Sequence, residues 1–282
     1  MKLTSAQIAF YNENGYLHIE NYFSKADVEL LIAELPNTVE PNSPRIILED
    51  NGSVRSVFAP HFVNETYDRL ARLDKLVTPA EQLINSQIYL HQYKINSKKG
   101  LKGDWWEWHQ DFPYWHIDDG IKQPDMITVM LYLQDTDASN GALMIIPKSH
   151  KLGIVKFAEK DPLSFEEKLK YNEHHQETDY LSSLNSNIKF TVDHALLKEM
   201  SIANGIVTAS GKKGSVLFFH GNVFHASNTN LTPFDRDAVL ITYNSINNLP
   251  GNNQHPRPDY LAGKNYAPIE AVETSLKMQD AV

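Results

Sequence analysis

The chain contains no cysteine. Disulfide bonds, thiolate metal sites and cysteine nucleophiles are therefore excluded, and any metal ion must be held by His, Asp or Glu. The chain also lacks a dense Lys/Arg cluster and has a net charge of −9, so we expect neither nucleic acid nor an anionic membrane as a partner. No run approaches 18 apolar residues and the N-terminus shows no basic-then-apolar signal pattern, which together predict a cytoplasmic protein.

The remaining composition is that of a globular protein. The 282 residues are 41% hydrophobic, which is enough for a substantial core and near the upper limit for one domain. No internal repeat or dividing linker interrupts the chain, so we expect a single domain over residues 1–282. Residues 156–186 differ from the rest because they are charged and poor in leucine, and we expect a helical lid or insertion there. The adjacent His174 and His175 in that segment favour a solvated pair, since neighbours in a helix do not face one another.

Helical signals dominate the first third of the chain. Thr4 and Gln7 form a capping box for a helix that ends near Asn14, where Gly15 is a natural C-cap. A second helix is expected from Ser24 to Leu35, ended by Pro36. The spacing of apolar residues predicts further helix over residues 63–86, interrupted at Pro79.

Short strands are also expected between these helices, and from residue 87 onward the hydrophobic period changes to two. We expect strands at residues 16–19, 45–48, 53–57, 87–96, 105–111, 126–133, 141–146, 188–192, 215–220 and 238–244. Helices followed by many short strands favour an α+β fold. Its core is expected to be a double-stranded β-helix of the jelly-roll or cupin-like type, with N-terminal and packing helices.

The segment 105–116 holds all four tryptophans of the chain together with a His-x-Asp sequence, His109-Gln110-Asp111. On an extended strand His109 and Asp111 point to the same face. Two such ligands and a distant histidine form the 2-His-1-carboxylate triad of non-haem iron(II) oxygenases. The alternative is a polar pair on a solvated edge strand.

The third ligand can come from the segment 214–227, which offers His220 and His225. Eleven residues after His225, Arg236 opens an apolar strand, where its guanidinium can hold a carboxylate through two parallel hydrogen bonds. Ser227 shares a strand face with His225 and can add a hydroxyl. The plainer alternative is a surface arginine paired with Asp235 or Asp237.

These motifs resemble the phytanoyl-CoA dioxygenase-like iron(II)/2-oxoglutarate oxygenases, and within them the branch of ectoine hydroxylases and free amino-acid hydroxylases. The resemblance covers roughly residues 85–262. The segments that carry it are Trp108–Phe112, Trp115-His116, Asp119-Gly120, Asn140–His150, His225–Asn228, Asn230–Phe234 with Arg236, and Pro256-Arg257-Pro258.

The resemblance implies a role for ten residues. Iron(II) ligands with a catalytic role are His109, Asp111 and His225; 2-oxoglutarate contacts are Arg236, Ser227, Asn96 and Trp106; substrate contacts are Gln92, Trp115 and Leu240. It also implies O₂ as co-substrate, oxidative decarboxylation of 2-oxoglutarate to succinate and CO₂, and hydroxylation of an unactivated C–H bond. Aromatic pocket walls are expected from Trp106, Trp115 and Phe112, and His91, His116 and His150 are expected beside the site rather than on the metal.

Two departures from ectoine hydroxylases bear on the substrate. Those enzymes usually carry Ser where this chain has Gln110, and an aromatic residue where it has Leu240. Similar proline-, leucine- and pipecolate-type hydroxylases carry His-Gln-Asp, so we expect a free L-amino acid of proline, pipecolate or branched aliphatic type, bound by a monomer or homodimer. Ectoine is the alternative substrate.

Three other classes are less consistent with these residues. A halogenase of this fold would need Ala or Gly in place of Asp111, and a zinc hydrolase would have no use for a keto-acid anchor. A cupin-like binding protein with a vestigial metal site conflicts with a complete triad beside Arg236.

Overall fold

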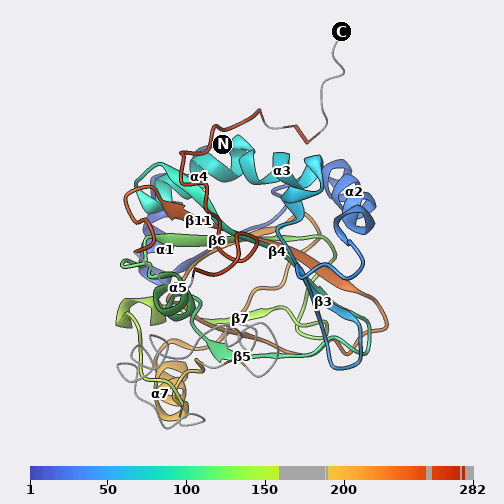
Figure 1. Cartoon of the computed structure of the whole chain (residues 1–282). Helices are drawn as coiled ribbons and strands as arrows, with labels where there is room; N and C mark the ends of the chain where they lie inside the picture. The colour runs from blue at the N-terminus through green and yellow to red at the C-terminus, as the bar shows by residue number, and fades with distance from the viewer. Residues whose placement is uncertain (159–187, 189, 252–255, 274, 277–282) are drawn as a thin grey trace.

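Two antiparallel sheets form the centre of the protein (Figure 1). The computed structural model describes residues 1–158, 188, 190–251, 256–273 and 275–276. In these residues the larger sheet has the order β1 Tyr16–Ile19, β9 Val216–His220, β6 Met126–Tyr132, β11 Arg236–Ser245, β4 Ile88–Lys98, β3 Val54–Phe58 and β2 Ile46–Leu48. The smaller sheet has the order β5 Trp106–His109, β10 Phe224–Ser227, β7 Leu143–Ile146 and β8 Val207–Thr208. Two antiparallel sheets with packing helices confirm the α+β jelly-roll prediction.

The strand β11 places functional residues at the middle of the larger sheet. It pairs antiparallel with β4 on one side and β6 on the other, so that Leu240 lies opposite both Lys94 and Met130. Side chains alternate along a strand, and Arg236 and Leu240 therefore share one face while Val239 and Ile241 share the other. The first face lines a cavity and the second joins the main hydrophobic core.

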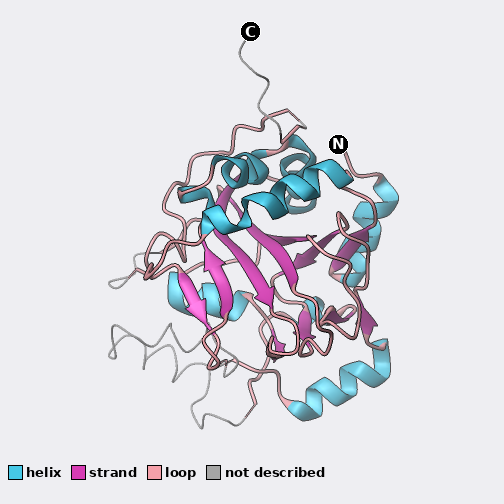
Figure 2. Ribbon diagram, turned by 90° about the vertical axis from the view of Figure 1, so that its right-hand side faces the viewer, coloured by secondary structure: helices cyan, strands magenta, loops and turns pink. Residues whose placement is uncertain are grey.

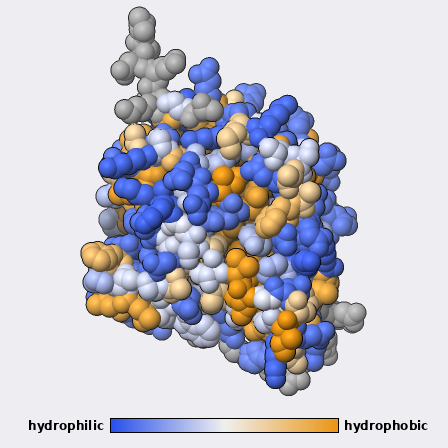
Figure 3. Space-filling view, turned by 180° about the vertical axis from the view of Figure 1, so that it is seen from behind, coloured by the Kyte–Doolittle hydropathy of each residue, from blue (hydrophilic) through white to orange (hydrophobic). Residues whose placement is uncertain are grey.

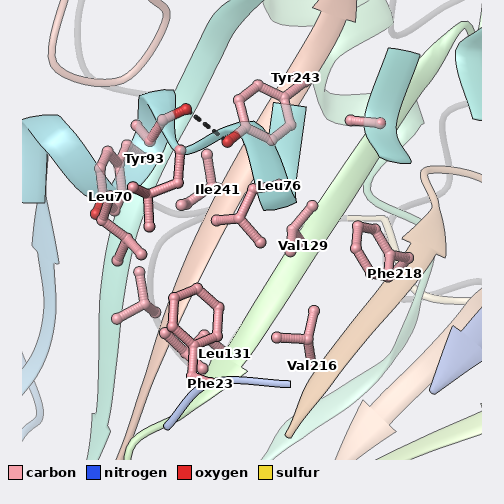
Figure 4. Close-up of a cluster of buried hydrophobic side chains, with 14 of the residues drawn as sticks. Phe23, Leu70, Leu76, Tyr93, Val129, Leu131, Val216, Phe218, Ile241 and Tyr243 are labelled. Atoms are coloured by element: carbon pink, nitrogen blue, oxygen red, sulfur yellow. Dashed lines mark hydrogen bonds between the residues drawn. The ribbon is translucent and has the colours of Figure 1, made fainter. Parts of the chain in front are cut away.

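Four helices cover the outer face of the larger sheet (Figures 1 and 2). They are α1 Ser5–Asn14, α2 Lys25–Glu34, α3 Glu65–Arg72 and α4 Asp74–Ile84. The capping box of Thr4 and Gln7 and the left-handed cap at Gly15 are both present, as predicted. Figure 4 shows the core between helices and sheet, where Leu70 and Leu76 meet Val129, Phe218 and Ile241. The Tyr243 hydroxyl in this core donates to the carbonyl of Ala71 at 2.7 Å, which ties the sheet to α3.

The prediction that Pro79 interrupts the helical segment was wrong. The break lies at Leu73, between α3 and α4, and Pro79 stands inside α4. A proline there leaves the carbonyl of Lys75 without its helical partner. The hydroxyl of Tyr22 donates to that carbonyl instead, so a side chain from another element satisfies the group. The predicted end of the second helix is confirmed to within one residue, because α2 ends at Glu34 and Pro36 lies in the 3₁₀ turn Leu35–Thr38 that follows.

The tryptophan-rich segment is not one long strand. The strand β5 ends at His109, and Asp111 has helical torsion angles (φ −77°, ψ −38°) at the start of α5 Phe112–Asp119. Pro113 explains the change, because it has no N–H for strand pairing and its fixed φ suits the first turn of a helix. Trp115 and His116 accordingly lie on α5.

Residues 188–192 do not form a strand in the part of the chain that the structure describes. Only two isolated bridges occur there, Thr191 with His109 and Val192 with Phe157. The helix α7 His194–Asn204 follows and was not predicted. The expected lid falls almost entirely on residues outside the described ones, as do His174 and His175.

Hydrophobic and hydrophilic residues alternate in small groups on the face shown in Figure 3. Short 3₁₀ turns at Pro60–Phe62 and Ser149–Leu152 complete the described elements. Among the described helices, none has the length and apolar character required to cross a membrane.

Candidate metal centre and active site

Three side chains from the smaller sheet and the turn after β5 converge. His109 ends β5, His225 lies directly opposite it on β10, and Asp111 begins the turn into α5. The Nε2 atoms of His109 and His225 lie 3.6 and 3.8 Å from Asp111 Oδ1. One ligand atom from each of the three lies within 4.8 Å of the others, which is the grouping that a metal ion requires.

Hydrogen bonds behind the two histidines fix their orientation. Nδ1 of His109 donates to the carbonyl of Glu107 at 2.6 Å, and Nδ1 of His225 donates to that of Val223 at 3.0 Å. With the proton on Nδ1, each Nε2 presents a lone pair toward Asp111, as a metal ligand must. The donor set of two neutral imidazoles and one carboxylate therefore fits iron(II).

Electrostatics keep His225 and Asp111 in their metal-binding protonation states. Burial and the neighbouring His109 lower the pKa of His225 to about 4, so this imidazole is neutral near pH 7. Burial by itself would raise the pKa of Asp111, but His225, His109 and Lys94 outweigh it and hold that pKa well below its ordinary range.

All ten residues singled out from the sequence line one cavity. The metal group and the proposed 2-oxoglutarate and substrate contacts are His109, Asp111, His225, Arg236, Ser227, Asn96, Trp106, Gln92, Trp115 and Leu240. The smaller sheet supplies the histidines and Ser227, whereas the larger sheet supplies Arg236, Asn96, Gln92 and Leu240. A ligand in this cavity therefore contacts both sheets.

Arg236 is buried in the cavity wall, with 2% of its surface exposed. Its Nε donates to the carbonyl of Asn140 at 3.3 Å and its Nη2 to that of Gly141, which fixes the plane of the guanidinium. Gly141 adopts φ +83°, and a Cβ atom there would lie 2.5 Å from the carbonyl oxygen of Asn228. Burial lowers the pKa of Arg236 to about 10, so it stays charged.

The carboxylates next to Arg236 in the sequence have other partners. Asp235 binds Lys99 at 2.7 Å, while Asp237 accepts from Ser97 at 2.5 Å. Within the described residues, no carboxylate lies at ion-pair distance from Arg236. The surface ion pair considered as the plainer alternative is therefore absent there.

A second buried guanidinium lines the cavity and was not singled out from the sequence. Arg257 donates to Asp119 through Nε at 2.7 Å and Nη2 at 2.5 Å, and His91 Nε2 lies 3.0 Å from the same carboxylate. The His91 ring meets the edge of Trp115 at a centroid distance of 5.9 Å. Arg257 belongs to the motif Pro256-Arg257-Pro258, but nothing in the spacing of that motif predicts that Arg257 contacts Asp119, 138 residues away in the sequence.

Two lysines also line the same cavity. Lys98 donates to the carbonyls of Asn228, at 2.8 Å, and Asp104, while burial and the like charge of Arg236 lower its pKa to about 6. Lys94 lies on β4 between Gln92 and Asn96, and burial lowers its pKa against the opposing effect of Asp111. No sequence pattern predicts these lysines in the cavity beyond their positions on the cavity-lining strand β4.

Three other expectations are resolved by side-chain contacts. Gln110 donates to the carbonyls of Gly153 and Asn222 and accepts from the amide of Val155, so it supports the turn and does not line the cavity. Phe112 packs against Trp115 in a separate apolar cluster and is not a cavity wall. His220 lies in another hollow beside His150, with a ring-centroid distance of 5.2 Å.

A 2-His-1-carboxylate group in a jelly roll, with a buried arginine in the same cavity, defines a class: the non-haem iron(II) oxygenases that use a keto acid. Residues 11–238 match the Phytanoyl-CoA dioxygenase (PhyH) family. The chain belongs to this family and is an iron(II)- and 2-oxoglutarate-dependent dioxygenase.

Several characterised proteins are similar over most of their length. An ectoine dioxygenase of Bordetella bronchiseptica is 33% identical over 270 residues, covering 92% of this chain and 82% of that protein. An L-proline trans-4-hydroxylase of Streptomyces griseoviridis is 30% identical over 265 residues, covering 93% and 94%. The crystal structure of EctD from S. alaskensis with 2-oxoglutarate and 5-hydroxyectoine has a TM-score of 0.80 and 28% identity, covering 98% of this chain and 89% of that one.

Proposed function

We propose that this enzyme hydroxylates an unactivated C–H bond of a small free L-amino acid of proline, pipecolate or branched aliphatic type, with release of succinate and CO₂. The observation that carries the proposal is the buried Arg236, which lacks an ion-pair partner among the described residues and shares a cavity with the metal group. A buried cation without a counter-ion is costly, so an anionic ligand is expected there.

The residues divide into a metal group and a keto-acid group. His109, Asp111 and His225 hold iron(II), which supplies the oxidising chemistry when 2-oxoglutarate and O₂ are bound. Arg236 and Ser227 hold the distal carboxylate of 2-oxoglutarate through charge-assisted and hydroxyl hydrogen bonds.

Asn96 and Trp106 form the wall beside the keto acid. The side-chain oxygen of Asn96 accepts from the Ser56 hydroxyl at 2.8 Å, which orients its amide. Trp106 stands opposite Ser227 in the register of β5 and β10. These residues set the shape of the keto-acid site rather than its charge.

The substrate side has groups suited to a zwitterion. Arg257, oriented by Asp119, offers a cation for the substrate carboxylate. Gln92 donates through Nε2 to the carbonyl of Leu261 at 2.8 Å, which leaves its amide oxygen as the group that can accept from an ammonium. Trp115 covers the apolar part of the ligand.

Leu240 decides between the two substrate classes. It lies on the cavity face of β11 with Met130 opposite, where an aliphatic wall suits a saturated ring or branched chain. Ectoine is the second candidate, favoured by the similarity to ectoine dioxygenases. The planar delocalised amidine of ectoine would be better covered by an aromatic residue at this position.

The test compares specificity constants for L-proline, pipecolate, L-leucine and ectoine, measured as substrate-dependent succinate formation with mass spectrometry of the product. We expect the specificity constant for one of the L-amino acids to exceed that for ectoine, and Leu240→Phe to shift the ratio of the two constants toward ectoine. A clear preference of the wild type for ectoine would overturn the amino-acid proposal. Absence of succinate with all four compounds would overturn both substrate candidates.

A further inference from the structure

A buried arginine stacks on Trp106, a residue of the cavity wall. Arg55 lies on β3 with 1% of its surface exposed, and its guanidinium carbon is 3.7 Å from the centroid of the Trp106 ring. Its Nη1 bonds both carboxylate oxygens of Glu49, at 2.9 and 2.8 Å, and its Nη2 donates to the carbonyl of Trp105 at 3.1 Å. These contacts hold the guanidinium against the indole.

The same indole belongs to the active site. Trp106 lines the cavity, whereas Arg55 does not. Its ring lies 6.3 Å from that of His109, and its backbone pairs with that of Ser227. With one face covered by Arg55, the indole can present only its other face and its edges to a ligand.

We propose that Arg55 is a positioning residue for 2-oxoglutarate: its stacked guanidinium holds Trp106 in the orientation that closes the cavity wall beside Ser227. The inference rests on the proposed place of the keto acid between Arg236 and the metal group. Arg55 acts through the indole and does not itself touch the ligand.

Glu49 fixes this arrangement from the turn between β2 and β3. Besides binding Arg55, its Oε1 accepts from the amide of Asp104 at 3.3 Å, in the loop that leads into β5. Both members of this ion pair therefore bond the segment that leads into β5, Glu49 through the amide of Asp104 and Arg55 through the carbonyl of Trp105. Lysine could keep the charge near Glu49, but it lacks the planar group that stacks on an aromatic face.

The same hairpin region provides a matched control. Arg45 is 6% exposed, pairs with Glu40 at 2.6 Å and donates to the carbonyls of Phe58 and Ala59. It is a buried arginine with comparable hydrogen bonding, but it does not line the cavity or contact Trp106. An effect of Arg55→Lys that Arg45→Lys does not reproduce therefore cannot come from loss of a buried guanidinium in general.

The experiment is a calorimetric titration of 2-oxoglutarate into the full chain loaded anaerobically with iron(II). We expect Arg55→Lys to weaken 2-oxoglutarate binding roughly 3- to 30-fold, the range of a desolvated cation–π contact, with metal affinity unchanged. Trp106→Phe should weaken it similarly, and the double variant should add little because both changes remove the same interaction. Arg45→Lys should bind 2-oxoglutarate like the wild type.

Each remaining outcome has one meaning. If the wild type binds 2-oxoglutarate and Arg55→Lys binds it equally well, or if Arg45→Lys weakens it as much, Arg55 does not position the site. If the wild type itself fails to bind, the proposed function fails instead. Should Arg55→Lys not fold, Glu49→Gln replaces it: this variant keeps the shape of the side chain but loosens Arg55, and unchanged 2-oxoglutarate affinity there overturns the inference.

Discussion

At the scale of single residues, His225 on β10 and His220 at the end of β9 make different contacts. His225 directs Nε2 toward Asp111 at 3.8 Å. His220 uses Nδ1 to accept from the amide of Asn222 at 3.0 Å, and burial lowers its pKa to about 4. Only the first belongs to the metal group, although the two are five residues apart.

We expect His225→Ala to abolish iron(II) binding and His220→Ala to retain it, because only the former removes a ligand atom. Anaerobic metal titration of both variants checks this, with circular dichroism as the control for folding. Loss of metal binding in His220→Ala but not in His225→Ala would show that the distal ligand has been wrongly assigned.

Arg236 supplies a second residue-scale prediction. Arg236→Lys keeps a charge but loses the planar pair of donors, so we expect 2-oxoglutarate affinity to fall by about 2–4 kcal/mol, roughly 30- to 1000-fold. The measurement is the Michaelis constant for 2-oxoglutarate at saturating iron(II), with Arg45→Lys as the matched buried arginine. An unchanged constant would mean that another residue of the cavity holds the distal carboxylate.

At the scale of elements, periodicity predicted most strands but not where β5 ends. The two-residue period continues in the sequence through Asp111, whereas Pro113 starts a helix and turns the backbone. The His-x-Asp pattern predicted that His109 and Asp111 meet because side chains alternate along a strand. In the structure they meet because the backbone turns from strand to helix between them. The Pro79 error has a similar origin, because the compensating Tyr22 hydroxyl comes from a distant segment.

The helix α5 also ends in a buried ion pair. Asp119, its last residue, binds Arg257 and His91, and Gly120 follows in the left-handed conformation at φ 71°. Burial would raise the pKa of Asp119, but Arg257 and His91 lower it below the ordinary value of 3.8. A carboxyl group with a lowered pKa stabilises the fold above that ordinary value, and this stabilisation is lost as the pH falls through the lowered one.

We therefore expect Asp119→Asn to reduce the free energy of unfolding by roughly 3–5 kcal/mol near pH 7, because it leaves Arg257 as an uncompensated buried charge. The variant should also lose less stability than the wild type on acidification below about pH 4. Its Michaelis constant for the amino acid should rise, with 2-oxoglutarate affinity retained. Urea unfolding at several pH values tests this, with the exposed Asp50→Asn as control. Equal acid sensitivity in Asp119→Asn and the wild type would contradict it.

At the scale of the whole molecule, the sequence could identify which residues meet but not every segment that completes the cavity. His109, His225 and Arg236 lie on strands with clear alternation, so the face of its strand that each occupies could be predicted from the pattern. Arg257 and Glu49 lie in irregular segments, and their place beside the cavity depends on packing that no local period encodes. Arg257 is the ion-pair partner of Asp119, and Glu49 is that of Arg55.

The distribution of ligands between the sheets leads to a last prediction. The metal ligands come from β5, β10 and the turn after β5, whereas Arg236 and Asn96 come from the larger sheet. Iron(II) should therefore stabilise the smaller sheet, and 2-oxoglutarate should then link the two. At about 100 times the dissociation constant, each ligand contributes about 2.7 kcal/mol, or a rise in melting temperature of roughly 5–10 °C.

Scanning calorimetry under anaerobic conditions can separate the two increments. We expect iron(II) alone to raise the melting temperature, and 2-oxoglutarate to add a second rise only when the metal is present. At the same ligand concentration, Arg236→Lys should retain the first increment and lose most of the second. Because the variant leaves His109, Asp111 and His225 intact, a loss of both increments would instead indicate that Arg236 maintains the structure of the metal group. A full second increment in Arg236→Lys would show that the keto acid does not join the sheets through this residue.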